Sequence, residues 1–166
     1  MTTQIRHGVF ETNSSSTHSI SIAGAVGVCP EACRLKPDDD GVLRLETGEF
    51  GWEIADYRDP WTKAAYAATF VMNLTAPEQK YDDPHLGRES LSAHGQEHYE
   101  MLVTTLKEHT GAKEVVIEKS SDRFNPYGDI DHQSFHVAAD AFESSEQLAA
   151  FILNDESTLH TDNDNH

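Results

Sequence analysis

Short runs of alternating polar and apolar residues open this chain and predict two strands. The segment "THSISI" at 17–22 alternates polar residues with Ile20 and Ile22, and a period of two is typical of a half-buried strand. The segment "IRHGVF" at 5–10 predicts a second short strand, which makes the polar residues 11–16 the connection between the two. Further along, "GVLRLETGEFGWEI" at 41–54 predicts a hairpin that turns at Thr47-Gly48.

Helical signals appear in the middle of the chain. Asp59-Pro60 places a favoured cap residue before a proline that suits the first turn. The helix that follows should end before Pro77. A second helix is expected over about 90–109, with Gly111 just past its end. Its apolar stripe has helical spacing and consists of Tyr99, Leu102, Val103 and Leu106.

The C-terminal part adds a strand, a helix and a tail. The segment "KEVVIEK" at 113–119 predicts a strand, and residues 120–140 are expected to be turns with a short extended piece. Ser144 and Gln147 fit a capping box that opens a last helix. Because strands and helices mix without regular alternation, we predict an α+β fold with a small mixed or antiparallel sheet and about three helices.

Chain length and tail composition set the domain organisation. The 166 residues suit a single domain, which we assign to 1–158. We assign residues 159–166 to an acidic, flexible tail, with one short strand near Leu159 at its start.

Charge narrows the partners. The chain has 29 acidic and 12 basic residues and a net charge of −17, so direct nucleic-acid binding is not expected. Three interpretations remain open: a solvated acidic surface, adaptation to high salt, and an acidic decoy that imitates DNA phosphates. No apolar run reaches the roughly 18 residues of a membrane span, and no export signal precedes the first strand, so neither a membrane nor secretion is expected.

The segment "ETNSSSTHS" at 11–19 is the first candidate for chemistry. Its hydroxyl and amide side chains, together with backbone N–H groups, can hold a phosphate or carboxylate, and His18 adds a group that can carry a proton. The alternative is a polar turn whose hydroxyls satisfy their own backbone.

Two further segments carry acidic residues. In "YGDIDHQSFH" at 127–136, Asp131 beside His132 suits a metal or proton transfer, and an extended backbone would place His132, Ser134 and His136 on one face. Near the C-terminus, Asp162 and Asp164 can coordinate a hard cation through oxygen atoms. An acidic surface loop and a solvated tail are the respective alternatives. The cofactor is therefore unknown, with a divalent metal as the candidate.

Three stretches, "IRHGVFETNSSSTHSISI" at 5–22, "GDIDHQS" at 128–134 and "FILNDESTLHTDND" at 151–164, resemble a family of uncharacterised proteins encoded mostly by tailed bacteriophages and related prokaryotic viruses. The resemblance implies a viral source and action in the cytoplasm of the infected host cell, and it implies no mechanism. Because these stretches contain the three polar segments chosen on chemical grounds, we expect the segments to form one site.

The leading hypothesis is a virus-encoded accessory protein with a polar pocket for a phosphate-containing, nucleotide-like ligand, with catalysis left open. The alternatives are an acidic nucleic-acid mimic that inhibits a host defence or transcription protein, and a virion or assembly component with a salt-adapted surface. The predicted catalytic residues are His18, Asp131 and His132; the ligand-binding residues are Arg6, Thr12, Asn13, Ser14, Ser15, Ser16 and Ser134; the metal-binding residues are Asp162 and Asp164.

Overall fold

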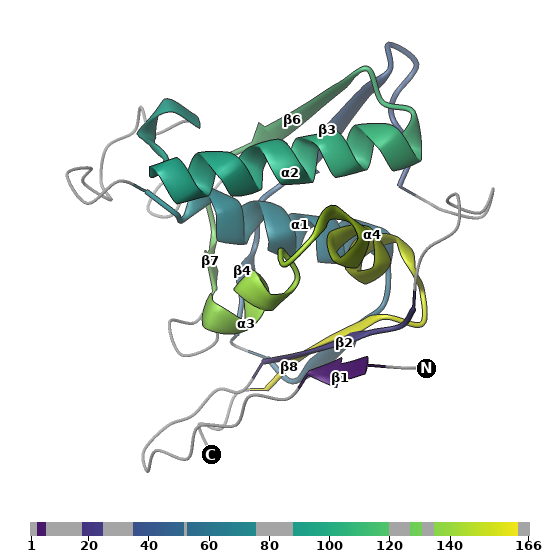
Figure 1. The fold of residues 1–166 in the computed structure, drawn as a ribbon, viewed down its shortest axis with the longest axis vertical. Coiled ribbons are helices and arrows are strands. Elements are labelled where there is room, and N and C mark those ends of the chain that lie inside the picture. Colours follow the sequence, from purple (N-terminus) through teal and green to yellow (C-terminus); the bar gives the residue numbers. More distant parts are fainter. Residues whose placement is uncertain are drawn as a thin grey trace.

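The chain adopts an α+β fold in which a helical layer separates two sets of strands (Figure 1). The computed structural model describes residues 3–5, 18–24, 35–51, 53–75, 88–119, 127–130 and 135–162. The helices are α1 (Pro60–Met72), the 3₁₀ turn η1 (Arg88–Ser90), α2 (Ala93–Thr110), α3 (Phe135–Asp140) and α4 (Ser145–Leu153). The strands are β1 (Thr3–Ile5), β2 (Ser19–Ile22), β3 (Val42–Glu46), β4 (Glu49–Phe50), β5 (Ala55–Tyr57), β6 (Glu114–Glu118), β7 (Asp129–Ile130) and β8 (Thr158–Thr161). The predicted fold class is confirmed.

One strand layer is an antiparallel sheet, called sheet A here, with the strand order β1-β2-β8-β5. Ile20, Ile22 and Leu159 are buried, and the residues between them are partly exposed. This alternation places one face of sheet A against the helices and leaves the other face polar. Strand β8 lies inside the sheet, so residues 159–161, assigned to the tail from sequence, belong to the folded domain.

The other strand layer consists of parallel pairs, β3 with β6 and β4 with β7. The hairpin predicted at Thr47-Gly48 is therefore wrong, because β3 and β4 follow one another along the same line and do not pair with each other. The buried Thr69 of α1 satisfies the backbone at the break: its hydroxyl accepts a hydrogen bond from the Gly48 N–H at 2.9 Å and donates to the Ala65 carbonyl at 2.8 Å.

On the partner side, Gly128, the residue directly before β7, comes very close to Gly48. Gly128 has φ +63°, and a Cβ atom at this position would overlap the Gly48 carbonyl oxygen. The Asp129 N–H donates to that same oxygen at 3.0 Å, and the Asn73 side chain of α1 donates to the Gly128 carbonyl at 3.3 Å. Both the positive φ and the close approach require glycine at 128.

Helix ends agree with the sequence signals at three helices. Asp59 and Ser144 cap α1 and α4, and Gly111 ends α2 in the left-handed conformation, as the sequence predicts. The start of α2 is capped by Ser92, which the sequence analysis did not single out. The capping box of α4 is only half formed, because the Gln147 side chain donates to the Asp140 carbonyl. No helix in the described parts of the chain is long and apolar enough to cross a membrane.

Helix α3 was not predicted. Residues 135–140 were expected to be turn or extended, and they form a short helix that packs against α1 and β2. We predicted that an extended backbone would place His136 on one face with His132 and Ser134. This prediction is wrong for His136, which lies in a helix. The physical reason is burial, since Val137 and Ala138 pack into the core and helical backbone satisfies its own polar groups there.

The core lies between α1, α4, α2 and the two strand layers, with Tyr66, Phe70 and Phe151 among its largest fully buried side chains. Lys63 is fully buried beside them. Its ammonium donates to the Asn154 carbonyl at 2.6 Å and to the Ser157 carbonyl at 3.0 Å. Lys63 thereby binds the carbonyl of Asn154, the residue that caps the end of α4, and the carbonyl of Ser157, the residue before β8.

Candidate functional site

The described residues that border the three polar segments come together at one end of sheet A. Strand β1 ends at Ile5, His18 precedes β2, and Asp162 follows β8. The register pairs Ile5 with Ile20 and Ser19 with His160, which places these three positions at the same end. Helix α3, which follows residues 131–134, packs against β2 and lies over this end in Figure 1.

His18 lies on the helix-facing side of sheet A. Its side chain is 1% exposed, and its Nδ1 atom is 3.3 Å from the hydroxyl oxygen of Tyr66 in α1. Burial raises the pKa of Tyr66 well above its ordinary value, so this hydroxyl stays protonated. The structure places the imidazole of His18 in the interior, between sheet A and α1. The catalytic role of His18 stays a prediction.

A row of three polar residues crosses the opposite face of sheet A. The register places Ser19 of β2 on one side of His160 and Asp56 of β5 on the other, and directly opposed residues share a face. His160 Nδ1 and Asp56 Oδ1 are 2.7 Å apart. The His160 side chain is 38% exposed and that of Asp56 is 64% exposed.

This row holds an accessible imidazole in one orientation. A carboxylate on Nδ1 favours the tautomer that carries its hydrogen on Nδ1, which leaves the Nε2 lone pair to accept a hydrogen bond or a proton. A contact between exposed polar side chains adds about 1 kcal/mol of stability or less. The contact between Asp56 and His160 therefore mainly fixes the position of the imidazole ring and adds little to the stability of the fold.

Sequence reasoning did not select His160 or Asp56. The alternation in "STLHT" does place His160 on the face opposite Leu159. Its neighbours, however, come from strands more than a hundred positions earlier in the chain. No local signal states which strand pairs with which, so the row could not be read from the sequence.

Asp162 follows β8 directly and is partly exposed. Within the described ranges, no group of three or more His, Cys, Asp or Glu side chains is arranged to hold a metal ion. The metal-binding role of Asp162 therefore stays a prediction.

The remaining predicted site residues lie outside the residues that the structure describes, and their roles stay predictions. They are Arg6, Thr12, Asn13, Ser14, Ser15, Ser16, Asp131, His132, Ser134 and Asp164.

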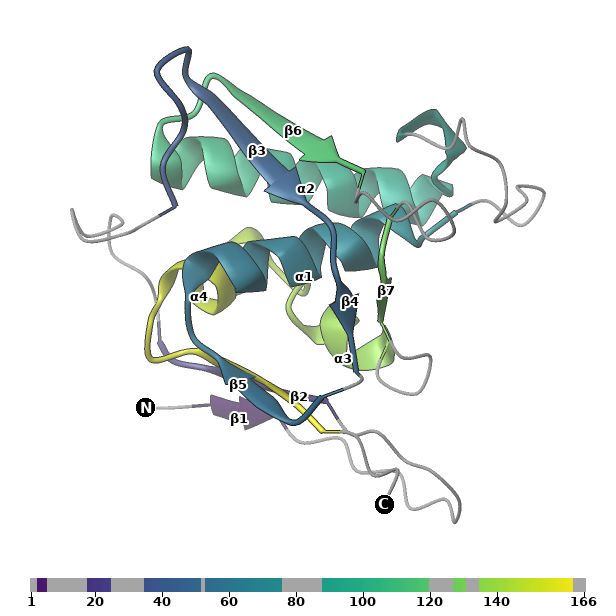
Figure 2. The same cartoon turned by 180° about the vertical axis from the view of Figure 1, so that it is seen from behind.

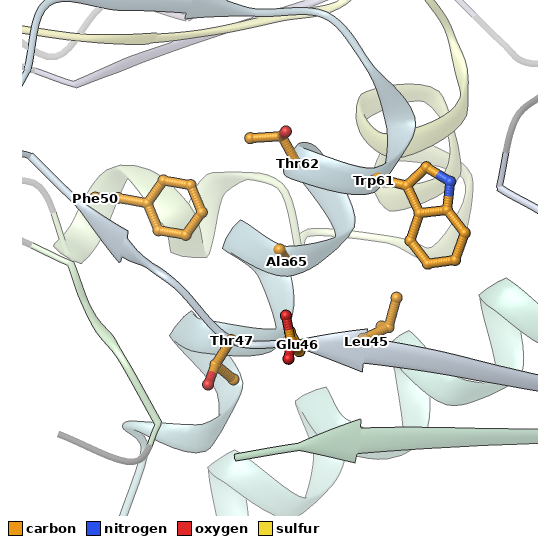
Figure 3. A pocket seen from close by; sticks show the side chains of 7 residues that line it. All are labelled: Leu45, Glu46, Thr47, Phe50, Trp61, Thr62 and Ala65. Carbon is orange, nitrogen blue, oxygen red and sulfur yellow. The ribbon is translucent and has the colours of Figure 1, made fainter. Parts of the chain in front are cut away.

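A second feature, which the sequence did not indicate, is a hollow of about 360 Å³ between the first turns of α1 and the line of β3 and β4 (Figure 3). Trp61 and Phe50 lie on opposite sides of it, and Glu46 lies between them. Trp61 is 39% exposed. The lining residues are Leu45, Glu46, Thr47, Phe50, Trp61, Thr62 and Ala65.

No protein-family model, no curated protein and no solved structure matched this chain. The function is therefore inferred from the residues and their arrangement.

Proposed function

We propose that the polar end of sheet A binds a small phosphate-containing ligand, with His160 as the group that contacts the phosphate. The observation that carries this proposal is the His160–Asp56 pair in register with Ser19. A serine hydroxyl and an oriented imidazole are both suited to phosphate oxygens. Asp56 holds the Nδ1 side of the imidazole, so Nε2 is the ring atom left to contact the phosphate.

The polar segments support the same location. By sequence, Arg6 follows Ile5 directly, and the hydroxyl-rich residues 12–16 precede His18. Both ends of that segment are tied to the end of sheet A that holds the row. The resemblance to phage-encoded proteins supports placing this binding role in a virus-encoded accessory protein of the infected cell.

The competing interpretation is that the row is an ordinary polar sheet surface. Exposed faces of antiparallel sheets are commonly polar, and cross-strand pairs of opposite charge are a usual way to stabilise them. The two interpretations differ in what the imidazole does, because a surface pair has no affinity for phosphate.

The test is a titration of the full chain with inorganic phosphate, AMP and ATP, followed by amide chemical shifts and by the thermal midpoint. We expect shifts at Ser19 and His160, and a rise of the midpoint that follows ligand concentration. His160→Gln should weaken binding about tenfold, the loss of one charge-assisted hydrogen bond.

His109→Gln is the matched control, since His109 lies in the last turn of α2 and outside sheet A, which holds the row. It should bind each ligand as the wild type does. Equal affinities for the two variants, or no response to any of the three ligands, would refute the proposal.

A further inference from the structure

Among the described strands only β6 pairs with β3, and the other edge of β3 lies beside the hollow. The Gly41 carbonyl accepts from the Glu114 N–H at 3.4 Å, and the Thr47 N–H donates to the Glu118 carbonyl at 3.5 Å. In a parallel pair the backbone groups of alternate residues face the same neighbour. The odd-numbered residues of β3 therefore face β6, and the even-numbered ones face the other way.

Three residues have their backbone groups on that outer edge. Val42 is paired there with Asp38, through the Asp38 side chain at 2.8 Å and its N–H at 2.9 Å. For Arg44 and Glu46, the described parts of the chain provide no partner for the backbone N–H or carbonyl on this edge. Figure 2 shows β3 with β6 on one side only.

The hollow next to this edge favours a positive charge. Glu46 is the charged residue among its lining, and its carboxylate has no hydrogen bond or ion pair within the described residues. Trp61 presents an aromatic side chain to the same hollow, and tryptophan is the best aromatic partner for a cation. The net charge of −17 adds a long-range attraction for basic partners.

An anionic occupant would meet the opposite conditions. The N-terminus of α1 could attract an anion, but the Asp59 carboxylate already accepts the Thr62 N–H at 2.8 Å. Arg44 is held by Glu118 at 3.0 Å and by Asp38 at 3.6 Å. Among the described residues, no basic side chain lines the hollow.

We propose that an extended basic segment of a partner protein adds to the outer edge of β3 as a further strand and places one lysine or arginine side chain between Trp61 and Glu46. Strand addition satisfies the open backbone groups of Arg44 and Glu46, and the hollow selects the side chain. This surface lies on the opposite side of α1 from sheet A and is independent of the phosphate proposal.

The probe is an acetylated nonapeptide of alternating valine and arginine, titrated into the full chain by calorimetry and followed by amide chemical shifts. We expect shifts at Arg44, Glu46 and Trp61. Glu46→Gln and Trp61→Ala should each weaken binding about tenfold. Glu114→Gln removes a carboxylate of the same sheet outside the hollow and should leave the affinity unchanged.

A pair of substitutions at position 44 separates backbone from side chain. Arg44→Pro removes an edge N–H without removing a backbone bond to β6, and it should bind the peptide about tenfold more weakly than Arg44→Gln, which loses the same ion pair with Glu118. Arg44→Gln keeps that N–H and removes a like charge, so it should strengthen binding. Circular dichroism confirms that both variants fold.

Several results would overturn the proposal. They are equal binding of a valine–glutamate peptide, equal affinities for Arg44→Pro and Arg44→Gln, and no binding of the valine–arginine peptide at millimolar concentration. Arginine amide binding as tightly as the peptide would show a small-cation pocket without strand addition, and would refute it as well.

Discussion

At the scale of single residues, Lys63 is the least expected feature of the core. Its side chain is fully buried, and its ammonium donates to two backbone carbonyls in the segment between α4 and β8. Desolvation, partly offset by Asp59 and Asp155, lowers the pKa of Lys63 from 10.5 to about 8. Lys63 therefore titrates at a pH where other lysines remain charged.

This shift predicts a pH dependence of stability. Between the folded pKa of about 8 and the unfolded value of 10.5, the unfolded chain binds more protons, so stability rises with pH. The penalty of burying the charge is fully present below pH 8 and is relieved above it. From pH 8 to pH 9.5, the wild type should gain about 2 kcal/mol relative to Lys63→Met in urea unfolding. Parallel stability curves for the two proteins would contradict the shift.

Two glycines with positive φ should respond differently to the same substitution. Gly128 has φ +63° and meets the Gly48 backbone, whereas Gly111 has φ +74° and open space where its Cβ would be. Gly111→Ala should cost about 1 kcal/mol, the strain of the left-handed conformation. Gly128→Ala should cost about 3 kcal/mol or more, because the clash is added. Urea denaturation measures both costs. Equal costs would show that the backbone segments at Gly48 and Gly128 can move apart to relieve the clash.

At the scale of elements, α1 organises the molecule. Its first turns border the hollow, Lys63 and Tyr66 reach toward α4 and sheet A, and Thr69 and Asn73 hold the backbone at the break between β3 and β4. The sequence predicted this helix well because its signals are local. The Asp59 cap and Pro60 act within one turn of the chain, and so did the signals for α2 and α4.

The threonines of two helices provide a test of this role. Thr69 and Thr105 are both buried, but the Thr105 hydroxyl has no hydrogen-bond partner in the described part of the chain. Thr69→Val should cost about 2 kcal/mol, because it leaves the Gly48 N–H unpaired. Thr105→Val should be neutral or stabilising, since it replaces an unsatisfied buried hydroxyl with a methyl group of similar size. Thermal and urea unfolding give both values; a Thr105→Val cost equal to that of Thr69→Val would refute the assigned bonds.

The hairpin prediction at Thr47-Gly48 was wrong because strand pairing, unlike helix capping, is not decided locally. Thr47 and Gly48 look like a turn in sequence, but β3 pairs with β6, about seventy positions later, and the hydroxyl of Thr69 stabilises the straight passage. The His160 row was missed for the same reason, since its three members come from three distant strands. Local patterns predict the elements of this fold, and strand partners depend on contacts across the whole chain.

At the scale of the whole molecule, the net charge of −17 produces self-repulsion in the folded state. Because the chain has 29 acidic and only 12 basic residues, its basic side chains are too few to pair with every carboxylate. Salt screens this repulsion, with a Debye length of roughly 3 Å at 1 M.

We therefore expect stability to rise with ionic strength. From 0.05 to 1 M sodium chloride, the thermal midpoint should increase by roughly 3 °C, which corresponds to about 1 kcal/mol for a chain of this size. Choline chloride should act equally if screening is the cause. A midpoint that falls with either salt would show that repulsion does not limit this fold.

The position of β8 inside sheet A also bears on how the protein is made. Strand β2 ends at Ile22, and its inner neighbour begins at Thr158. A ribosome must therefore translate as far as Thr161 before β2 and β5 acquire the strand that joins them. Until then, the apolar face of β2 has no completed sheet, and the nascent chain depends on its acidic character, or on chaperones, to avoid aggregation.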